Sequence, residues 1–533
     1  TITQILAREL DRSPEHVQNV IDLIDEGNTI PFIARYRKEL HGAMDDQTIR
    51  TLADRLQYLR NLQTRREEVK HAIEGQGKLT DELAVAIDAA ATLAEVEDLY
   101  RPYKQKRRTR ATMAKEKGLE PLAQVLFAQE RDCPEPLEEA ARYVNPDKGV
   151  ETAEEALQGA SDIVAEWISD DAEIRKLLRD LFWKKGSLCS VAAAKEPEDS
   201  VYRLYYDFRT PVSRAQGHQI LAINRGEREE FLKVSVDFER AKALAIVCSN
   251  HVKEGSPATE TVRAAAQDAY DRLIFPSIER EIRSELTERA SDAAIKVFSL
   301  NLRHLLMQPP VKGKVALGLD PGYRTGCKTA VVDGTGKVLQ TGVIYPVPPH
   351  NKVEEAKRLV TGWIETYGVE IIAIGNGTAS HETEVFAADL IKSLHRKVAY
   401  MVVSEAGASV YSASKLAAEE FPDYDVSLRS AVSIARRLQD PLAELVKIDP
   451  KAIGVGQYQH DMPQKQLSEA LDGVVEGCVN TVGVDLNTAS APLLARVAGL
   501  SATVSKNVVT FREENGAFSS RAQLKKVPKL GPK

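Results

Sequence analysis

Several features are missing from this sequence, and each absence argues against a class of protein. It has no run of about 18 apolar residues and no signal-peptide pattern, so we expect a cytoplasmic protein without a membrane partner. It also lacks a Walker-type phosphate-binding motif. Its five cysteines have no CxxC spacing, which argues against a zinc site and is typical of a reducing compartment.

An excess of positive charge is missing too. The formal net charge is −7 at pH 7, so contact with nucleic acid requires a local basic patch. Aromatic residues make up only 6% of the chain, whereas 43% are hydrophobic and 28% are charged, which is an ordinary globular composition. Single cores stop growing near about 250–300 residues, so 533 residues indicate several domains. We expect a multidomain, mainly α-helical monomer.

Residues 1–66 contain the start and end signals of several short helices. Ser13 followed by Pro14 begins a helix, and Gly27 ends it. A second helix begins near Pro31 and carries three basic residues, Arg35, Arg37 and Lys38. The spacing is that of a helix-turn-helix-like region, which either reads DNA or packs on a neighbouring domain.

Residues 67–312 continue the helical pattern and predict a helical scaffold. Long amphipathic runs, such as Asp162–Phe182 and Val262–Val297, contain many Ala, Leu and Glu residues. One strand is predicted within the scaffold, at Leu232–Phe238.

One segment of the scaffold, residues 100–117, is strongly basic within an acidic chain. Basic groups release counterions from phosphates and aromatic rings stack on unpaired bases, so the combination favours single-stranded RNA or DNA. The alternatives are a solvated loop or a clamp onto an acidic neighbouring helix. The candidate contact residues are Tyr100, Arg101, Tyr103, Lys104, Lys106, Arg107, Arg108 and Arg110.

Residues 313–448 alternate strands and helices. The first three predicted strands form a meander, and Asp320 ends the first of them. RNase H-type nucleases place a metal-binding carboxylate at this position, and actin-like ATPases begin their phosphate-binding region with a similar strand. The ATPase alternative lacks a second phosphate loop in this region. The later elements complete a β-β-β-α-β-α-β-α order, which predicts an RNase H-like fold.

Residues 449–533 are predicted to form a linker followed by helices broken at glycines. Two stretches approach a helix-hairpin-helix pattern, in which a glycine turn lets backbone N–H groups face a phosphate. The first keeps Gly499 but has Ser501 at the second glycine position, and the second keeps Gly531 but has Lys529 at the first. The alternative is that both hairpins only pack as a helical domain. Nearby basic residues favour binding: Lys506, Arg512, Arg521, Lys525, Lys526 and Lys529.

Five stretches resemble the Tex family of bacterial transcription accessory proteins. They are PFIARYRKEL at 31–40, YRPYKQKRRTR at 100–110, ALGLDPGYRTGCKTAVVD at 316–333, SEAGASVYSAS at 404–414 and GVGQYQHDM at 454–462. The resemblance implies a helical N-terminal region around a YqgF-type RNase H-like domain, then tandem helix-hairpin-helix motifs. It also implies an OB-fold RNA-binding domain, before which we expect this chain to stop. The chain is similar as well to the core of the related eukaryotic elongation factor.

The resemblance also supplies candidate catalytic residues. Asp320 matches the first acid of the YqgF pattern, Glu405 the acid of a later loop and Asp440 the acid on the final helix. Two divalent cations require three or four such carboxylates. Asn376 is neutral where resolvase-like relatives often carry an acid, so Asp320 is expected to be a weak metal ligand. The alternatives are a capping role for Asp320 and ion pairing for Glu405.

These observations favour a transcription accessory factor that binds RNA or DNA without sequence preference. On this interpretation the RNase H-like domain is a degenerate scaffold and no cofactor is expected. One alternative is a Mg²⁺- or Mn²⁺-dependent nuclease or resolvase that uses Asp320, Glu405 and Asp440. Another is a protein scaffold that docks RNA polymerase or ribosome-associated factors.

Overall fold

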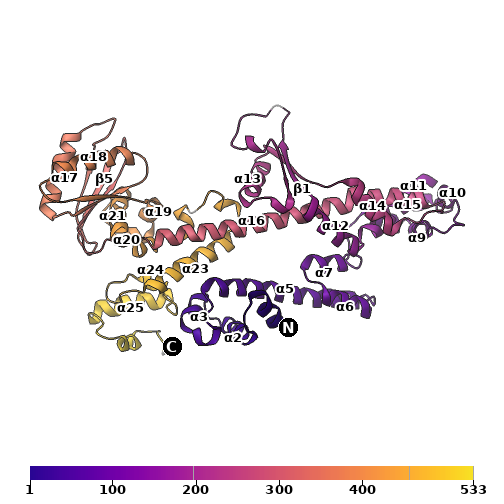
Figure 1. The fold of residues 1–533 in the computed structure, drawn as a ribbon, viewed down its shortest axis with the longest axis horizontal. Helices are drawn as coiled ribbons and strands as arrows, with labels where there is room; N and C mark the ends of the chain where they lie inside the picture. Colours follow the sequence, from indigo (N-terminus) through magenta and orange to yellow (C-terminus); the bar gives the residue numbers. More distant parts are fainter. Residues whose placement is uncertain (196, 455, 532–533) are drawn as a thin grey trace. The chain divides into compact units, whose positions relative to one another are not determined.

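The computed structural model describes residues 1–195, 197–454 and 456–531, and the chain divides into two compact units (Figure 1). The first unit comprises Thr1–Glu9 and Leu52–Ala293, and the second comprises Leu10–Thr51 and Ala294–Lys533. Two long helices, α5 (Asp46–Gly75) and α16 (Phe275–Leu306), continue from one unit into the other along the chain. The multidomain, mainly α-helical architecture predicted from the sequence is confirmed.

The first unit is built around the central helix α11 (Ala153–Ser169). Thr152 begins this helix, since its hydroxyl accepts a hydrogen bond from the Glu155 amide at 3.2 Å. Ala160 and Ile163 on α11 are fully buried against neighbouring helices. The other helices of this unit are α1 (Ile2–Leu10), α6 (Asp81–Ala89), α7 (Leu93–Tyr100), α8 (Arg110–Glu116), α9 (Glu120–Ala128), α10 (Pro136–Ala141), α12 (Ala172–Lys185), α13 (Gly217–Arg228), α14 (Arg240–His251), α15 (Thr259–Asp268) and the π-helix Ala269–Ile274.

A small antiparallel sheet interrupts the helices of the first unit. Its strands are β1 (Ser187–Ala192), β2 (Asp207–Pro211) and β3 (Leu232–Asp237), in the order β2-β1-β3. The sequence predicted only the strand that became β3, and the expectation of helices elsewhere was wrong for β1 and β2. Both missed strands are short, and β1 buries only Leu188 and Ser190, so the period-two signal is weak.

The second unit begins with three short helices, α2 (Pro14–Asp25), α3 (Ile30–Tyr36) and α4 (Lys38–His41). Ser13 caps α2 as predicted, because its hydroxyl accepts from the His16 amide at 3.2 Å. Helix α3 packs against α23 (Gln464–Val482) of the same unit.

The RNase H-like domain of the second unit is a five-stranded sheet covered on both faces. The strand order is β6-β5-β4-β7-β8, with β4, β5 and β6 antiparallel and β4, β7 and β8 parallel. Helices α17 and α18 pack on one face and α21 on the other. Because helices cover both faces of the sheet, successive side chains of β4 and β7 are buried on either side, and the two strands are unbroken apolar runs in the sequence. The elements are β4 (Ala316–Asp320), β5 (Cys327–Val332), β6 (Val338–Ile344), α17 (Val353–Tyr367), β7 (Ile371–Gly375), α18 (Ser380–Lys392), β8 (Ala399–Val403), α19 (Ala408–Ser412), α20 (Lys415–Glu420), α21 (Val426–Gln439) and α22 (Pro441–Leu445).

Gly318 in β4 allows α21 to lie close to the sheet. A Cβ at this position would lie 2.3 Å from the backbone oxygen of Ala431, so any larger residue would push the helix away. The close approach brings Ser430 of α21 to the end of β4, where Asp320 lies.

The C-terminal part of the second unit is helical. Helix α23 packs with the last residues of α16 in a core that includes Phe298, Leu467 and Val508. It is followed by α24 (Ala491–Leu494), α25 (Ala502–Asn515) and a 3-10 turn at Arg521–Lys526.

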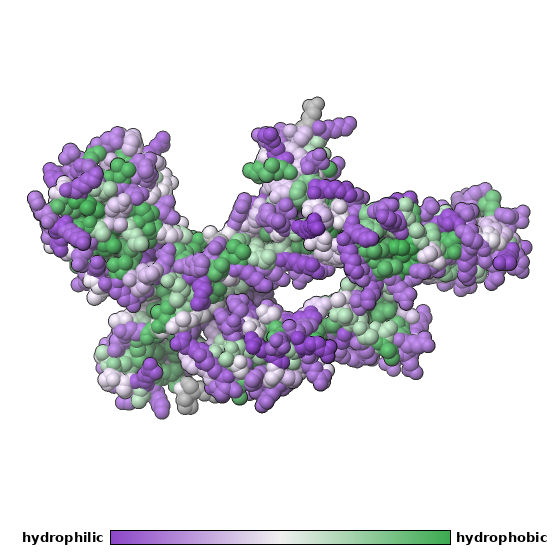
Figure 2. Space-filling model, viewed as in Figure 1, coloured by the Kyte–Doolittle hydropathy of each residue, from purple (hydrophilic) through white to green (hydrophobic). Residues whose placement is uncertain are grey.

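Hydrophilic residues cover most of the face displayed in Figure 2, with smaller apolar patches between them. Among the described residues, every helix is too short or too polar to span a lipid bilayer.

Candidate functional site

The basic segment connects α7 to α8 in the first unit and exposes four cationic side chains. These four are Lys104, Arg107, Arg108 and Arg110. None of them has an acidic partner within 4.0 Å in the part of the chain that the structure describes. They are therefore available to a phosphate backbone.

Lys106, also predicted as a contact residue, is less available than these four because its ammonium group is already paired with carboxylates. Its Nζ lies 3.1 Å from Glu166 Oε1 on α11 and also pairs with Asp170. Burial raises the pKa of Asp170, so the lysine charge compensates carboxylates that would otherwise be poorly solvated. Here the sequence alternative of a clamp onto an acidic helix is confirmed.

The other predicted members of the cluster are partly enclosed. The Arg65 guanidinium lies 5.4 Å from the centre of the Tyr100 ring and so occupies one of its stacking faces. Arg101 is half-buried, and its Nε is buried without a hydrogen-bond partner among the described residues. Tyr103 is half-buried, and its carbonyl accepts a hydrogen bond from Gln76 at 2.7 Å. The aromatic part of the predicted site is thus less open than its cations.

The first hairpin joins α24 to α25 in the second unit. Gly499 adopts a φ of +89°, which explains the glycine at this turn. Ser501 is the N-cap of α25, and its hydroxyl accepts from the Val504 amide at 3.2 Å. Ala502 and Thr503 are exposed at the start of the helix, where amides have no helical carbonyl to bind. The serine therefore preserves a helix start that can face a phosphate.

The second hairpin follows the 3-10 turn. Lys529 has a φ of +64° and so occupies the left-handed position that usually requires glycine. Asn507 of α25 donates to the Pro528 carbonyl at 2.9 Å and fixes this turn. Gly531 is exposed, and the residues after it lie outside the described part of the chain.

Exposed lysines surround both hairpins, whereas Arg512 points inward. Lys506, Lys525, Lys526 and Lys529 are exposed without an acidic partner within 4.0 Å among the described residues. Arg512 donates to the carbonyls of Leu486 and Ala489, both at 3.0 Å. Its assignment to the basic surface was wrong because the guanidinium holds the hairpin domain together.

Asp320 and Glu405 lie at the carboxyl end of the sheet in the RNase H-like domain. Burial raises the pKa of Asp320 to about 6, and the charge of Glu405 adds to this rise. A hydrogen bond from Ser430 opposes it, so the predicted capping role of Asp320 is replaced by a contact with α21. These two acids are brought together as predicted.

Glycines and one amide hold the Glu405 loop in place. A Cβ at Gly377 would lie 1.6 Å from Glu405 Oε1, so the carboxylate occupies space that only glycine leaves. The Asn376 side-chain oxygen accepts from the Glu405 amide at 3.0 Å. Arg437 donates to the carbonyls on either side, of Ser404 at 3.0 Å and Ala406 at 2.7 Å. Asn376 and Arg437 thus position the loop, and the amide oxygen of Asn376 is engaged.

Asp440 does not join this pair, and its assignment to the carboxylate set was wrong. Ser430, at the start of α21, contacts Asp320, and Asp440 follows ten residues later. At about 1.5 Å per residue, Asp440 lies roughly 15 Å along the helix from that contact. Asp440 instead caps α22 by accepting from the Ala443 amide at 3.2 Å.

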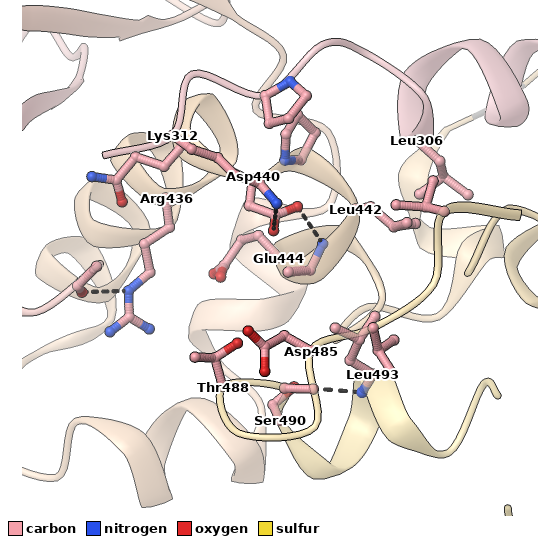
Figure 3. Close-up of a pocket in the computed structure, with 18 of the residues that line it drawn as sticks. Leu306, Lys312, Arg436, Asp440, Leu442, Glu444, Asp485, Thr488, Ser490 and Leu493 are labelled. Carbon is pink, nitrogen blue, oxygen red and sulfur yellow. Dashed lines mark hydrogen bonds and ion pairs between the residues drawn. The ribbon is translucent and has the colours of Figure 1, made fainter. Parts of the chain in front are cut away.

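Asp440 lines a pocket of about 770 Å³ within the second unit (Figure 3). The pocket lies between the segment after α16, the β5–β6 turn, α22 and the segment before α24. Its lining mixes cations with acids: Lys312, Arg436, Lys447, Asp440, Glu444 and Asp485. The mixture favours no single class of ligand.

Other acids of the domain are engaged elsewhere. Glu382 accepts from Tyr323, Glu384 from Tyr400, and Asp389 pairs with Lys357 at 2.6 Å. No group of three metal-ligating side chains with the geometry of an ion site occurs among the described residues. Sequence reasoning missed two residues: Ser430, which places a neutral hydroxyl beside Asp320, and Gly377. The dipeptide Asn376-Gly377 before a helix was the available signal for the latter.

Comparison with known proteins gives close relatives over the whole chain. It is 53% identical over 535 residues to an uncharacterized protein of Bacillus subtilis, of which it covers 74%. It is 48% identical over 545 residues to the transcriptional accessory protein Tex of Neisseria gonorrhoeae, of which it covers 70%. It is 39% identical over 551 residues to S1 RNA-binding domain-containing protein 1 of Homo sapiens, of which it covers 55%.

The fold and its sites define a mainly helical, multidomain protein with an RNase H-like domain and a helix-hairpin-helix motif. Four sequence families match successive parts: the Tex-like protein N-terminal domain at 1–74, the Tex central region-like family at 132–298, the Tex protein YqgF-like domain at 314–439 and the helix-hairpin-helix motif at 479–533. The chain belongs to the Tex family.

Proposed function

We propose that this chain is a nucleic-acid-binding transcription accessory factor. It binds the phosphate backbone without sequence preference. The observation that carries the proposal is the set of exposed cations without acidic partners, on the basic segment and around the two hairpins. In a chain of net charge −7, such cations would ordinarily be paired or dispersed. The name of one relative, the transcriptional accessory protein Tex of Neisseria gonorrhoeae, supports a role in transcription, and RNA polymerase or ribosome-associated factors are the partners we propose.

The proposed contacts are to phosphates rather than to base edges. The exposed helix start after Ser501 offers backbone amides, and the surrounding lysines offer mobile charges. Neither kind of group distinguishes one base from another, so affinity should depend on salt far more than on sequence.

The test is fluorescence anisotropy of the full chain with labelled single strands of several sequences over a range of salt. Replacing Lys104, Arg107, Arg108 and Arg110 with Ala should weaken binding to every sequence. The slope of log affinity against log salt should fall by at most about 2.8, at about 0.7 for each lost contact. A matched control removes four exposed, dispersed cations of the same unit: Arg131, Lys184, Lys185 and Lys233. Equal effects in the two variants would show that only net charge matters.

For the RNase H-like domain we propose a scaffolding role. Two converging carboxylates leave too little negative charge for two divalent cations, and the further group that contacts Asp320 is the neutral hydroxyl of Ser430. The competing function is a Mg²⁺- or Mn²⁺-dependent nuclease or resolvase. Incubation with RNA, single-stranded DNA and branched DNA separates them, because cleavage that Asp320→Asn abolishes would overturn the scaffolding proposal.

A further inference from the structure

We propose that α3 and the residue pair after it form a stacking platform for single-stranded nucleic acid. This α3 platform consists of Phe32, Arg35, Tyr36, Arg37 and Lys38, and it is a site additional to the basic segment and the hairpins. The inference rests on the function proposed above and adds a contact to unpaired bases.

The side chains of α3 are spaced so that one face of the helix is buried and the other is exposed to solvent. Ile33 is fully buried, whereas Tyr36 keeps 47% of its surface exposed. Phe32 and Tyr36 are four residues apart, so their rings lie on one side of the helix, with centroids 5.4 Å apart. The helix thus presents Tyr36 to solvent, with the half-buried Phe32 beside it, while Ile33 packs inward.

Arginines flank both rings. The Arg37 guanidinium lies 5.2 Å from the centre of the Phe32 ring, and that of Arg35 lies 5.9 Å from the centre of the Tyr36 ring. Each guanidinium covers one face of its ring, as Arg65 does at Tyr100, so a base would stack on the outer face of the guanidinium or on the other face of the Tyr36 ring. Every base has a flat face that can stack in this way.

The charges of the platform are not neutralised. Arg35, Arg37 and Lys38 have no acidic partner within 4.0 Å among the described residues. Arginines elsewhere are commonly paired, as Arg55 is with Glu9 at 2.8 Å. Free cations beside exposed rings favour a polyanion with unpaired bases over an apolar or basic protein surface.

The platform is held firmly in place within the second unit. Thr29 caps α3 by accepting from the Phe32 amide, and its hydroxyl also contacts Glu476 on α23. The Asn19 side chain donates to the Leu40 carbonyl at 3.0 Å and fixes the following turn. Ordering before binding limits the entropy lost when a base stacks.

The experiment measures affinity of the full chain for labelled oligo(dT) and oligo(U) as salt is varied. Tyr36→Ala should weaken binding roughly tenfold with little change in salt slope, since stacking carries no charge. Tyr36→Phe should bind like the unaltered chain. Arg35→Ala with Lys38→Ala should lower the slope by up to about 1.4. Strands that contain 4-thiouridine should photo-crosslink to Phe32 or Tyr36.

Tyr400→Ala is the matched control, because Tyr400 is an exposed tyrosine of the same unit at 37%. It should leave affinity unchanged. The platform is disproved if the platform variants bind normally while the basic-segment variant does not, and the proposed function then stands. Absence of binding by the unaltered chain would overturn both. Circular dichroism checks folding, and the charge variant decides the question if Tyr36→Ala unfolds.

Discussion

Lys104 and Lys106 are two positions apart on the basic segment, and their surroundings give them different roles. Lys104 is exposed, whereas Lys106 pairs with Glu166 and Asp170, whose side chains keep only 12% and 10% of their surface. Removing the lysine takes the neighbouring cation from two enclosed carboxylates, and Glu166 then keeps the hydrogen bond that it accepts from Thr109 at 3.0 Å.

We expect Lys106→Ala to lower the free energy of unfolding by roughly 3 kcal/mol, because buried charges would lose their compensation. Lys104→Ala should change it by less than about 0.5 kcal/mol and should weaken nucleic-acid binding instead. Urea unfolding followed by Trp167 fluorescence measures the first effect, since Trp167 adjoins Glu166. Equal stability of the two variants would contradict the ion-pair account.

Asp320 predicts a dependence of stability on pH. Its pKa is about 6 in the folded chain against an ordinary value of 3.8, so the folded state holds the proton more tightly. Stability should therefore fall as pH rises from about 4 to about 6, and stay lowered above that. Asp320→Asn should remove this fall and add roughly 3 kcal/mol at pH 7.

The measurement for Asp320 is urea unfolding followed by Trp363 in α17, with Trp167 and Trp183 replaced by Phe. The comparison at about pH 3 is the control, because Asp320 is then mostly protonated in both states. A variant that is less stable than its parent at pH 7 would show that the ionised carboxylate is stabilising.

At the scale of elements, the loop between β7 and α18 and the loop after β8 depend on each other. Gly377→Ala should destabilise the RNase H-like domain by roughly 1–3 kcal/mol, because the new methyl group displaces Glu405. Gly362→Ala in α17 meets no atom within 4 Å and should stabilise the helix by about 0.5–1 kcal/mol. Unfolding of the two variants under identical conditions checks both signs.

Elements with strong local signals were predictable. The cap at Ser13 and the three-stranded meander appear in the structure where the sequence places them or within a residue or two. The strands β1 and β2 were not predictable, because their pairing with distant β3 outweighs a weak local pattern. The same applies to Asp440, because its position just after the end of α21 follows from how that helix crosses the sheet.

At the scale of the whole molecule, exposed cations without acidic partners lie in both compact units, on the basic segment and around the two hairpins. The salt slopes of two sets should add if one strand contacts both: Lys104, Arg107, Arg108 and Arg110 in the first unit, and Lys506, Lys525, Lys526 and Lys529 in the second. Each set should lower the slope by up to about 2.8, and the combined variant by up to about 5.6. A combined variant with the slope of one single set would show that only one set contacts the strand.

The sequence by itself determined the helix and strand boundaries that depend on neighbouring residues, the order of the RNase H-like elements and the likeness to the Tex family. It could do so because caps, turns and apolar periods act within a few residues of the chain. The tertiary structure decided which side chains remain available. Lys106 and Arg512 are engaged within their own units, Asn376 is a loop anchor and Asp440 is separated from Asp320, all through contacts between residues far apart in the chain. Burial and charge pairing depend on such long-range contacts, so they cannot be predicted from a local sequence pattern.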